Sequence, residues 1–201
     1  MANRPNSIGF RWVRNKLAPT SEAPRITLPI ASAYATSLGR GAPVKLLSDG
    51  TVDLCATNGN VYGVFDGMAQ NYNASTGFVG PAPKYTATVT YGSDMSRQSL
   101  AYVIPVVNQV FRITCDDNVT ATTQAGYEAL VGGNIDFAAG TAAGDRSGHV
   151  ADISTIGTTA EDLRIVNIPD KTSTDFSATG VEIEVEFNLI QGTQVGSTTG
   201  I

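Results

Sequence analysis

The segment that most constrains the fold lies near the end of the chain. Apolar residues occupy every second position from Val181 to Leu189, and Glu182, Glu184 and Glu186 lie between the first four of them. A period of two places alternate side chains on opposite faces of a β-strand. We therefore predict a strand with one face in a core. The glutamate row on its other face is either a solvated surface or an acidic surface for a basic neighbour.

Most of the remaining chain consists of short segments of β type separated by turns. Asp49-Gly50 predicts a hairpin within Ala42 to Cys55, because both residues tolerate the turn conformation. Further strands are expected in Arg25 to Ile30, Val61 to Tyr72, Thr86 to Tyr91, Leu100 to Asp117, Ile135 to Ala138, His149 to Thr155 and Leu163 to Ile168. The pattern favours an all-β fold, with a single barrel or sandwich body of short antiparallel strands.

One short helix is expected between the strands. Thr122 or Thr123 can cap its start, and Gly132-Gly133 can end it. Asn73 to Tyr85 is rich in turn residues and is expected to be an exposed insertion. In Val61 to Tyr72, the glycines at 63 and 67 indicate a bulge or a close approach of backbone.

The N-terminal region differs from the body in charge and pattern. Residues 1–25 hold five basic residues against Glu22 alone, a net charge of +4, whereas the other 176 residues carry −9. Three prolines interrupt any helix there. We expect an extended arm over 1–25, a β body over 26–192 and a tail over 193–201. A basic arm can dock onto its own acidic body or reach an acidic surface of a partner, and its charges are too few and too scattered to indicate nucleic-acid binding.

The residues offer little catalytic equipment. Cys55 and Cys115 lie far apart and read as small buried apolar residues, and His149 is the only histidine. A triad of Ser147, His149 and Asp152 is disfavoured because the sequence has no nucleophile elbow. We expect no enzyme, no cofactor and no metal site. Only 15% of residues are charged, against about 25% in typical proteins, which is compatible with a surface that packs against neighbours.

Membrane and export signals are also lacking in the sequence. No stretch approaches the roughly 18 apolar residues of a membrane span, and the first residues lack the apolar run of a signal peptide. We therefore expect a product of a cytoplasm with no membrane partner.

Several segments together resemble a family of capsid cement, or head decoration, proteins of tailed bacteriophages. They are GFRWVR (Gly9 to Arg14), the block from Gly39 to Met68, QVFRITCDD (Gln109 to Asp117), the step from Thr122 to Phe137, the stretch from Asp145 to Ile168 and the late strand EVEFNLIQ. Their order along the chain matches that of the family. Trp12 stands where the family has proline, and the usual Asn-Asn-His ending is missing.

The resemblance implies a structural protein on the outer surface of the expanded head. Its partner would be the major capsid protein, bound across subunit junctions, and it would associate with itself as a homotrimer or a dimer. The resemblance also implies an N-terminal extension that clamps the shell. On that basis Phe10 and Trp12 are expected to be apolar anchors, and Arg11 and Arg14 to pair with acidic capsid residues.

A binding module for host attachment is the alternative. A head or tail fibre domain or a carbohydrate-binding β module would need exposed aromatic side chains on loops. Tyr72, Phe78 and Tyr85 are the candidates in the sequence.

Overall fold

The structure is a computed structural model that describes residues 8–72, 79–86, 98–116, 121–139, 144–157, 161–169, 172 and 174–191. The expected strand over Thr86 to Tyr91 lies mostly outside these ranges, as do Phe78 and the tail over 193–201. The described residues form an all-β, sandwich-like body of two antiparallel sheets and one short helix, which confirms the predicted fold class. The described strands do not close into a barrel.

Sheet A contains six strands in the order β1-β8-β12-β11-β9-β10. Their bounds are β1 Arg11–Asn15, β8 Gln109–Thr114, β9 Asn134–Ala138, β10 Val150–Gly157, β11 Leu163–Asn167 and β12 Glu182–Phe187. The sheet curls strongly, so that β10 returns toward the end of β8, where the amide of Asp116 donates to the carbonyl of Ala151 at 3.0 Å.

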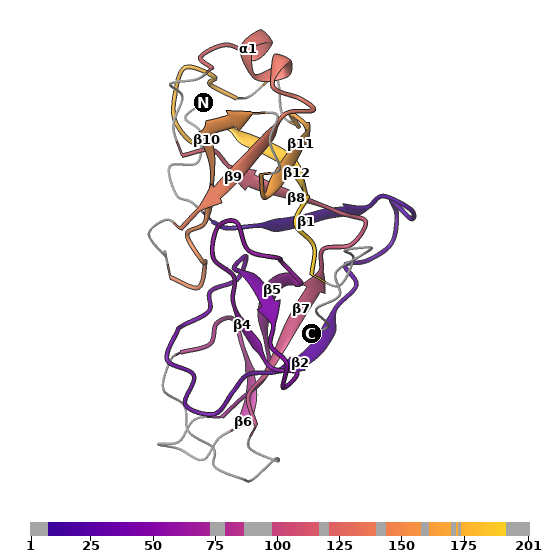
Figure 1. Cartoon of the computed structure of the whole chain (residues 1–201), viewed down its shortest axis with the longest axis vertical. Helices are drawn as coiled ribbons and strands as arrows, with labels where there is room; N and C mark the ends of the chain where they lie inside the picture. The colour runs from indigo at the N-terminus through magenta and orange to yellow at the C-terminus, as the bar shows by residue number, and fades with distance from the viewer. Residues whose placement is uncertain are drawn as a thin grey trace.

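Sheet B has the order β2-β7-β5-β3-β4, with β6 also paired to β5. Its strands are β2 Ile26–Pro29, β3 Pro43–Leu46, β4 Val52–Leu54, β5 Gly63–Tyr72, β6 Val79–Ala82 and β7 Leu100–Pro105. The two sheets lie end to end along the molecule, and β1 crosses at their junction (Figure 1).

The predicted hairpin turn and the predicted helix start are confirmed, whereas the helix ends before Gly132-Gly133, with Leu130 as its C-cap. Asp49-Gly50 joins β3 to β4, and the Asp49 carboxylate accepts a hydrogen bond from the amide of Thr51 at 2.9 Å. Helix α1 spans Gln124–Ala129, and the Thr123 hydroxyl caps it by accepting from the amide of Gly126 at 3.1 Å. The bulge expected in β5 lies between Phe65 and Gly67.

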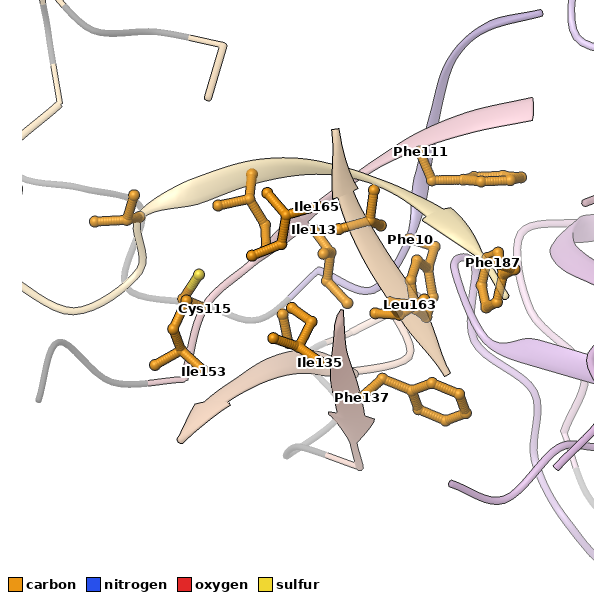
Figure 2. Packing of buried hydrophobic residues seen from close by; sticks show 14 of the residues in the cluster. Phe10, Phe111, Ile113, Cys115, Ile135, Phe137, Ile153, Leu163, Ile165 and Phe187 are labelled. Atoms are coloured by element: carbon orange, nitrogen blue, oxygen red, sulfur yellow. The ribbon is translucent and has the colours of Figure 1, made fainter. Parts of the chain in front are cut away.

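The larger core fills the concave side of sheet A. It gathers the inward side chains of β12, β8, β9, β10 and β11 and extends to Val64 and Ile104 at the ends of β5 and β7 (Figure 2). Val181, Ile183, Val185 and Phe187 are all buried, as the alternation predicts. A second cluster, which includes Phe65, Met68 and Tyr85, lies within sheet B.

The structure corrects one expected boundary and one expected exposure. Residues 11–15 are extended, but they form an edge strand of sheet A paired with β8, so this part of the predicted arm belongs to the body. The turn-rich insertion over Asn73 to Tyr85 contains β6, and Tyr85 is fully buried because its ring packs in the sheet B cluster and its hydroxyl donates to the carbonyl of Tyr34 at 3.1 Å.

Candidate functional site

Phe10 lies in the larger core rather than on the surface. Its side chain is 3% exposed, and its ring centroid lies 4.7 Å from that of Phe187 and 5.8 Å from that of Phe137 (Figure 2). The glycine before it has φ +69°, and the amide of Phe10 donates to the carbonyl of Gly41 at 3.0 Å. The expectation that Phe10 anchors a partner is therefore corrected, because an apolar ring gains more by entering the core of its own chain.

Trp12 is half-buried at the junction of the two sheets. Its indole N–H donates to Gln109 Oε1 at 2.7 Å, and part of its ring packs against the larger core. The rest of the ring borders a surface hollow. Trp12 thus remains near the surface, but its polar atom is already satisfied within the chain.

Arg11 and Arg14 form ion pairs with the glutamate row of β12. Arg11 pairs with Glu182, Arg14 Nη1 lies 2.6 Å from Glu184 Oε2, and Lys16 Nζ lies 2.5 Å from Glu186 Oε2. Arg112 on β8, the strand between β1 and β12, lies 3.6 Å from Glu182 and 3.2 Å from Glu184. We call these seven charged residues the charge ladder.

A β-bulge in β1 produces this arrangement. Trp12 pairs with Phe111 and Arg14 pairs with Val110, so β1 contains one extra residue between these two neighbouring pairs. Without the extra residue, Arg11 and Arg14 would point to opposite faces. The bulge brings both onto the face of the glutamates, and this explains why the basic segment lacks a period of two.

Glu184 is the buried centre of the charge ladder. Only 3% of the residue is exposed, and its carboxylate also accepts from Asn167 Nδ2 at 3.2 Å. Burial by itself raises the pKa of Glu184, but hydrogen bonds from Arg14, Asn167 and Arg112 outweigh it, and the net pKa is lowered. Of the two readings of the basic arm, docking onto its own body accounts for Arg11 and Arg14.

A second group of charges lies at the same junction. The Asp66 carboxylate accepts from Arg25 Nε at 2.6 Å and from Arg40 Nη2 at 2.7 Å, so one carboxylate serves two guanidinium groups. Arg40 stands between Gly39 and Gly41, which lie against the backbone of Arg146 and Phe10 respectively. These contacts fix the position of Arg40.

Two hollows flank the Asp66 carboxylate. The first, of about 330 Å³, lies beside sheet B and is bordered by Tyr102 and Gly67. The second, of about 260 Å³, lies toward sheet A and is bordered by Trp12 and Arg146. Arg25, Arg40 and Asp66 line both hollows. We call the surface formed by Trp12, Arg25, Arg40, Asp66, Tyr102 and Arg146 the arginine face.

The arginine face is the strongest candidate site in the described residues. Its guanidinium groups can hold carboxylates through paired hydrogen bonds, and its aromatic rings offer apolar contact area. No sequence pattern predicted this face. The only signal was an arginine between two glycines, Gly39-Arg40-Gly41, and nothing in the local pattern connects it to Arg25, Asp66 or Arg146.

The triad that the sequence disfavours does not form. The ring of His149 packs against Phe137 at a tilt of 59°, with centroids 5.8 Å apart, and the Asp152 carboxylate accepts from Ser154. Ser147 Oγ accepts from the backbone amide of His149 at 3.4 Å. Burial lowers the pKa of His149 to about 4, so the ring is neutral near pH 7.

The remaining buried reactive groups are held in structural positions. Cys55 and Cys115 are buried thiols that form no disulfide, and burial raises the pKa of Cys55 to about 11. Burial also raises the pKa of Asp162 to about 6, although its carboxylate accepts from the amide of Asn58 at 2.8 Å.

The described residues show neither a metal-binding cluster nor a membrane-spanning helix. Within those ranges no three His, Cys, Asp or Glu side chains are placed to hold a metal ion. None of the helical residues described forms a segment long and apolar enough to cross a membrane.

Comparison with protein-family models, with curated proteins and with solved structures finds no match to this chain.

Proposed function

We propose that this protein is a structural, non-enzymatic component of a tailed-phage head that binds the outside of the expanded shell and stabilises it. The resemblance to capsid cement proteins supports this proposal, because the segments that carry it form much of both sheets. Its segments supply β3, β4 and most of β5 in sheet B, and β8, β11 and most of β12 in sheet A. The segments that carry the resemblance therefore include strands of both sheets.

The observation that carries the proposal is the composition of the arginine face. Arginine, tryptophan and tyrosine are the residues most enriched where proteins bind other proteins. Here three arginines and two aromatic residues surround two hollows on a chain with few charged residues. Tyr102 is 37% exposed, although large aromatic residues usually find cover.

Partner contact through this face replaces the contact expected from the N-terminal residues. Phe10 packs in the core, and Arg11 and Arg14 form ion pairs with β12. Of the four expected contact residues, Trp12 alone also belongs to the arginine face. The face lies where the two sheets meet, which suits a protein that bridges two major capsid subunits. Binding to the expanded shell alone would stabilise that state by mass action. A homotrimer, or a dimer, would multiply the contacts.

Co-sedimentation of the purified protein with expanded heads that lack it tests the proposal. We expect saturable binding at a fixed ratio to the major capsid protein and a higher temperature of head rupture. Tyr102→Ala should weaken binding at least tenfold if the arginine face is the contact, since the few aromatic residues that dominate an interface contribute about 2 kcal/mol or more each. Val131→Ala is the matched control, because Val131 is 44% exposed but follows α1 at the far end of sheet A.

Two results would contradict the proposal. One is the absence of binding to heads. The other is recovery of the protein on host cells, which would favour the attachment module. That alternative has lost one of its three aromatic candidates, because Tyr85 is buried.

A further inference from the structure

The hollow beside Trp12 contains an excess of positive charge. Arg11, Arg25, Arg40 and Arg146 line it, and Asp66 is the only carboxylate in its wall. The whole chain carries a net charge of −5, so this concentration runs against the balance of the protein. Such a site attracts a single negative group.

The charges in the wall are not all neutralised by neighbours. Arg11 is paired with Glu182, and Arg25 and Arg40 share Asp66. Among the residues that the structure describes, no carboxylate lies within ion-pair distance of Arg146, and the adjacent Asp145 faces Lys84 at 3.9 Å. At least one guanidinium charge is therefore left for a ligand.

The backbone holds Arg146 in place. The amide of Arg40 donates to the carbonyl of Asp145 at 2.7 Å, and the amide of Ser147 donates to the carbonyl of Arg40 at 3.0 Å. These two bonds flank Arg146 on both sides. Because the backbone around Arg146 is already fixed, less conformational entropy is lost when a ligand binds, which favours binding.

The rest of the wall suits a short aliphatic chain. Trp12, Ala23 and Ile104 contribute apolar surface beside the arginines. An aspartate or glutamate side chain combines a carboxylate with one or two methylene groups, which match the charged and apolar parts of the wall. The neighbouring Asp66 shows that Arg25 and Arg40 already bind a carboxylate in this geometry. A polyanion such as nucleic acid would be repelled by the acidic body.

We propose that this hollow binds an aspartate or glutamate side chain of the partner protein, with Arg146 as the main ligand-binding residue. The inference rests on the proposed function only for the identity of the partner. The carboxylate chemistry follows from the residues of the hollow.

The fluorescence of Trp12 tests the inference, because Trp12 is the only tryptophan and borders the hollow. The probes are acetyl-Gly-Glu-Gly-amide, acetyl-Gly-Gln-Gly-amide and inorganic phosphate at constant ionic strength. We expect a saturable change with the glutamate peptide and none with the glutamine peptide. Arg146→Gln should weaken binding about tenfold, the loss expected for one hydrogen bond to a charged group.

Arg164→Gln is the control, since it removes the same charge from an exposed residue of β11 that lies outside the hollow. It should leave binding unchanged. Equal binding of the two peptides, wild-type binding by Arg146→Gln, or tighter binding of phosphate than of the glutamate peptide would overturn the inference. Because no heads are used, failure here would leave the head-binding proposal standing, and failure to bind heads would leave this site standing.

Discussion

Arg14 on β1 and Glu184 on β12 form an ion pair of 2.6 Å across the intervening strand β8, between residues 170 positions apart in the sequence. The pair fastens the N-terminal segment to the acidic face of the body. Glu184 is almost fully buried, so its charge depends on Arg14, Arg112 and Asn167. Removing one of these partners leaves a buried carboxylate partly unsatisfied.

Arg14→Ala should therefore lower the free energy of unfolding by about 1–3 kcal/mol. Chemical denaturation near pH 7 measures this. Lys16→Ala is the control within the same ladder, because the Lys16 side chain is 48% exposed and a surface pair contributes about 1 kcal/mol or less. Equal effects of the two substitutions would show that Glu184 does not need Arg14.

Phe10→Ala should lower the free energy of unfolding by about 3–5 kcal/mol, because it removes a ring packed against three other phenylalanines. The exposed Leu17 provides the comparison, and Leu17→Ala should change stability by no more than about 0.5 kcal/mol. If Phe10→Ala left stability unchanged and abolished head binding, Phe10 would be a partner anchor after all.

Gly41→Ala should be more harmful than the same change at Gly132. Both glycines have positive φ, +87° and +93°, but a Cβ at Gly41 would lie 2.8 Å from backbone atoms of Phe10, whereas the space at Gly132 is open. We expect Gly132→Ala to cost about 1 kcal/mol and Gly41→Ala about 1–3 kcal/mol more. Thermal unfolding of the two variants distinguishes strain from close packing, and equal costs would mean that the segments at the junction separate easily.

The pH dependence of stability should contain two opposing contributions. The pKa of His149 is 6.5 in the unfolded chain and about 4 in the folded protein. Between these values the unfolded state binds more protons, so His149 makes the free energy of unfolding rise with pH. Asp162 keeps its proton in the folded state up to about pH 6 but loses it near pH 3.8 when unfolded, so it makes stability fall as pH rises. The two effects overlap between about pH 4 and 6.

Single substitutions should separate these contributions. Relative to the wild type, Asp162→Asn should make the slope of stability against pH more positive in that window, and His149→Gln should make it more negative. Each change can reach about 1.4 kcal/mol per pH unit. Denaturation curves measured at half-unit steps test this, and slopes equal to that of the wild type would mean that neither group is buried as the structure shows.

The sequence by itself determined the β character of this protein and much of its local detail. The alternation from Val181 to Phe187 fixed which side of β12 enters the core, because side chains of a strand point alternately to opposite faces. Asp49-Gly50 and Thr123 specified a turn and a helix start through contacts between residues only a few positions apart. Because such contacts join residues close together in the sequence, a local sequence pattern can predict them.

Only the tertiary structure decided what the charged residues do. The glutamate row could face solvent or a basic neighbour, and the pairing of β1 with β8 supplies that neighbour from the other end of the chain. The bulge after Trp12 interrupts the period of two, so the sequence of β1 shows no alternation. Arg25, Arg40, Asp66 and Arg146 meet only where the two sheets join. Contacts between distant segments depend on sheet order and curvature, which no local pattern records.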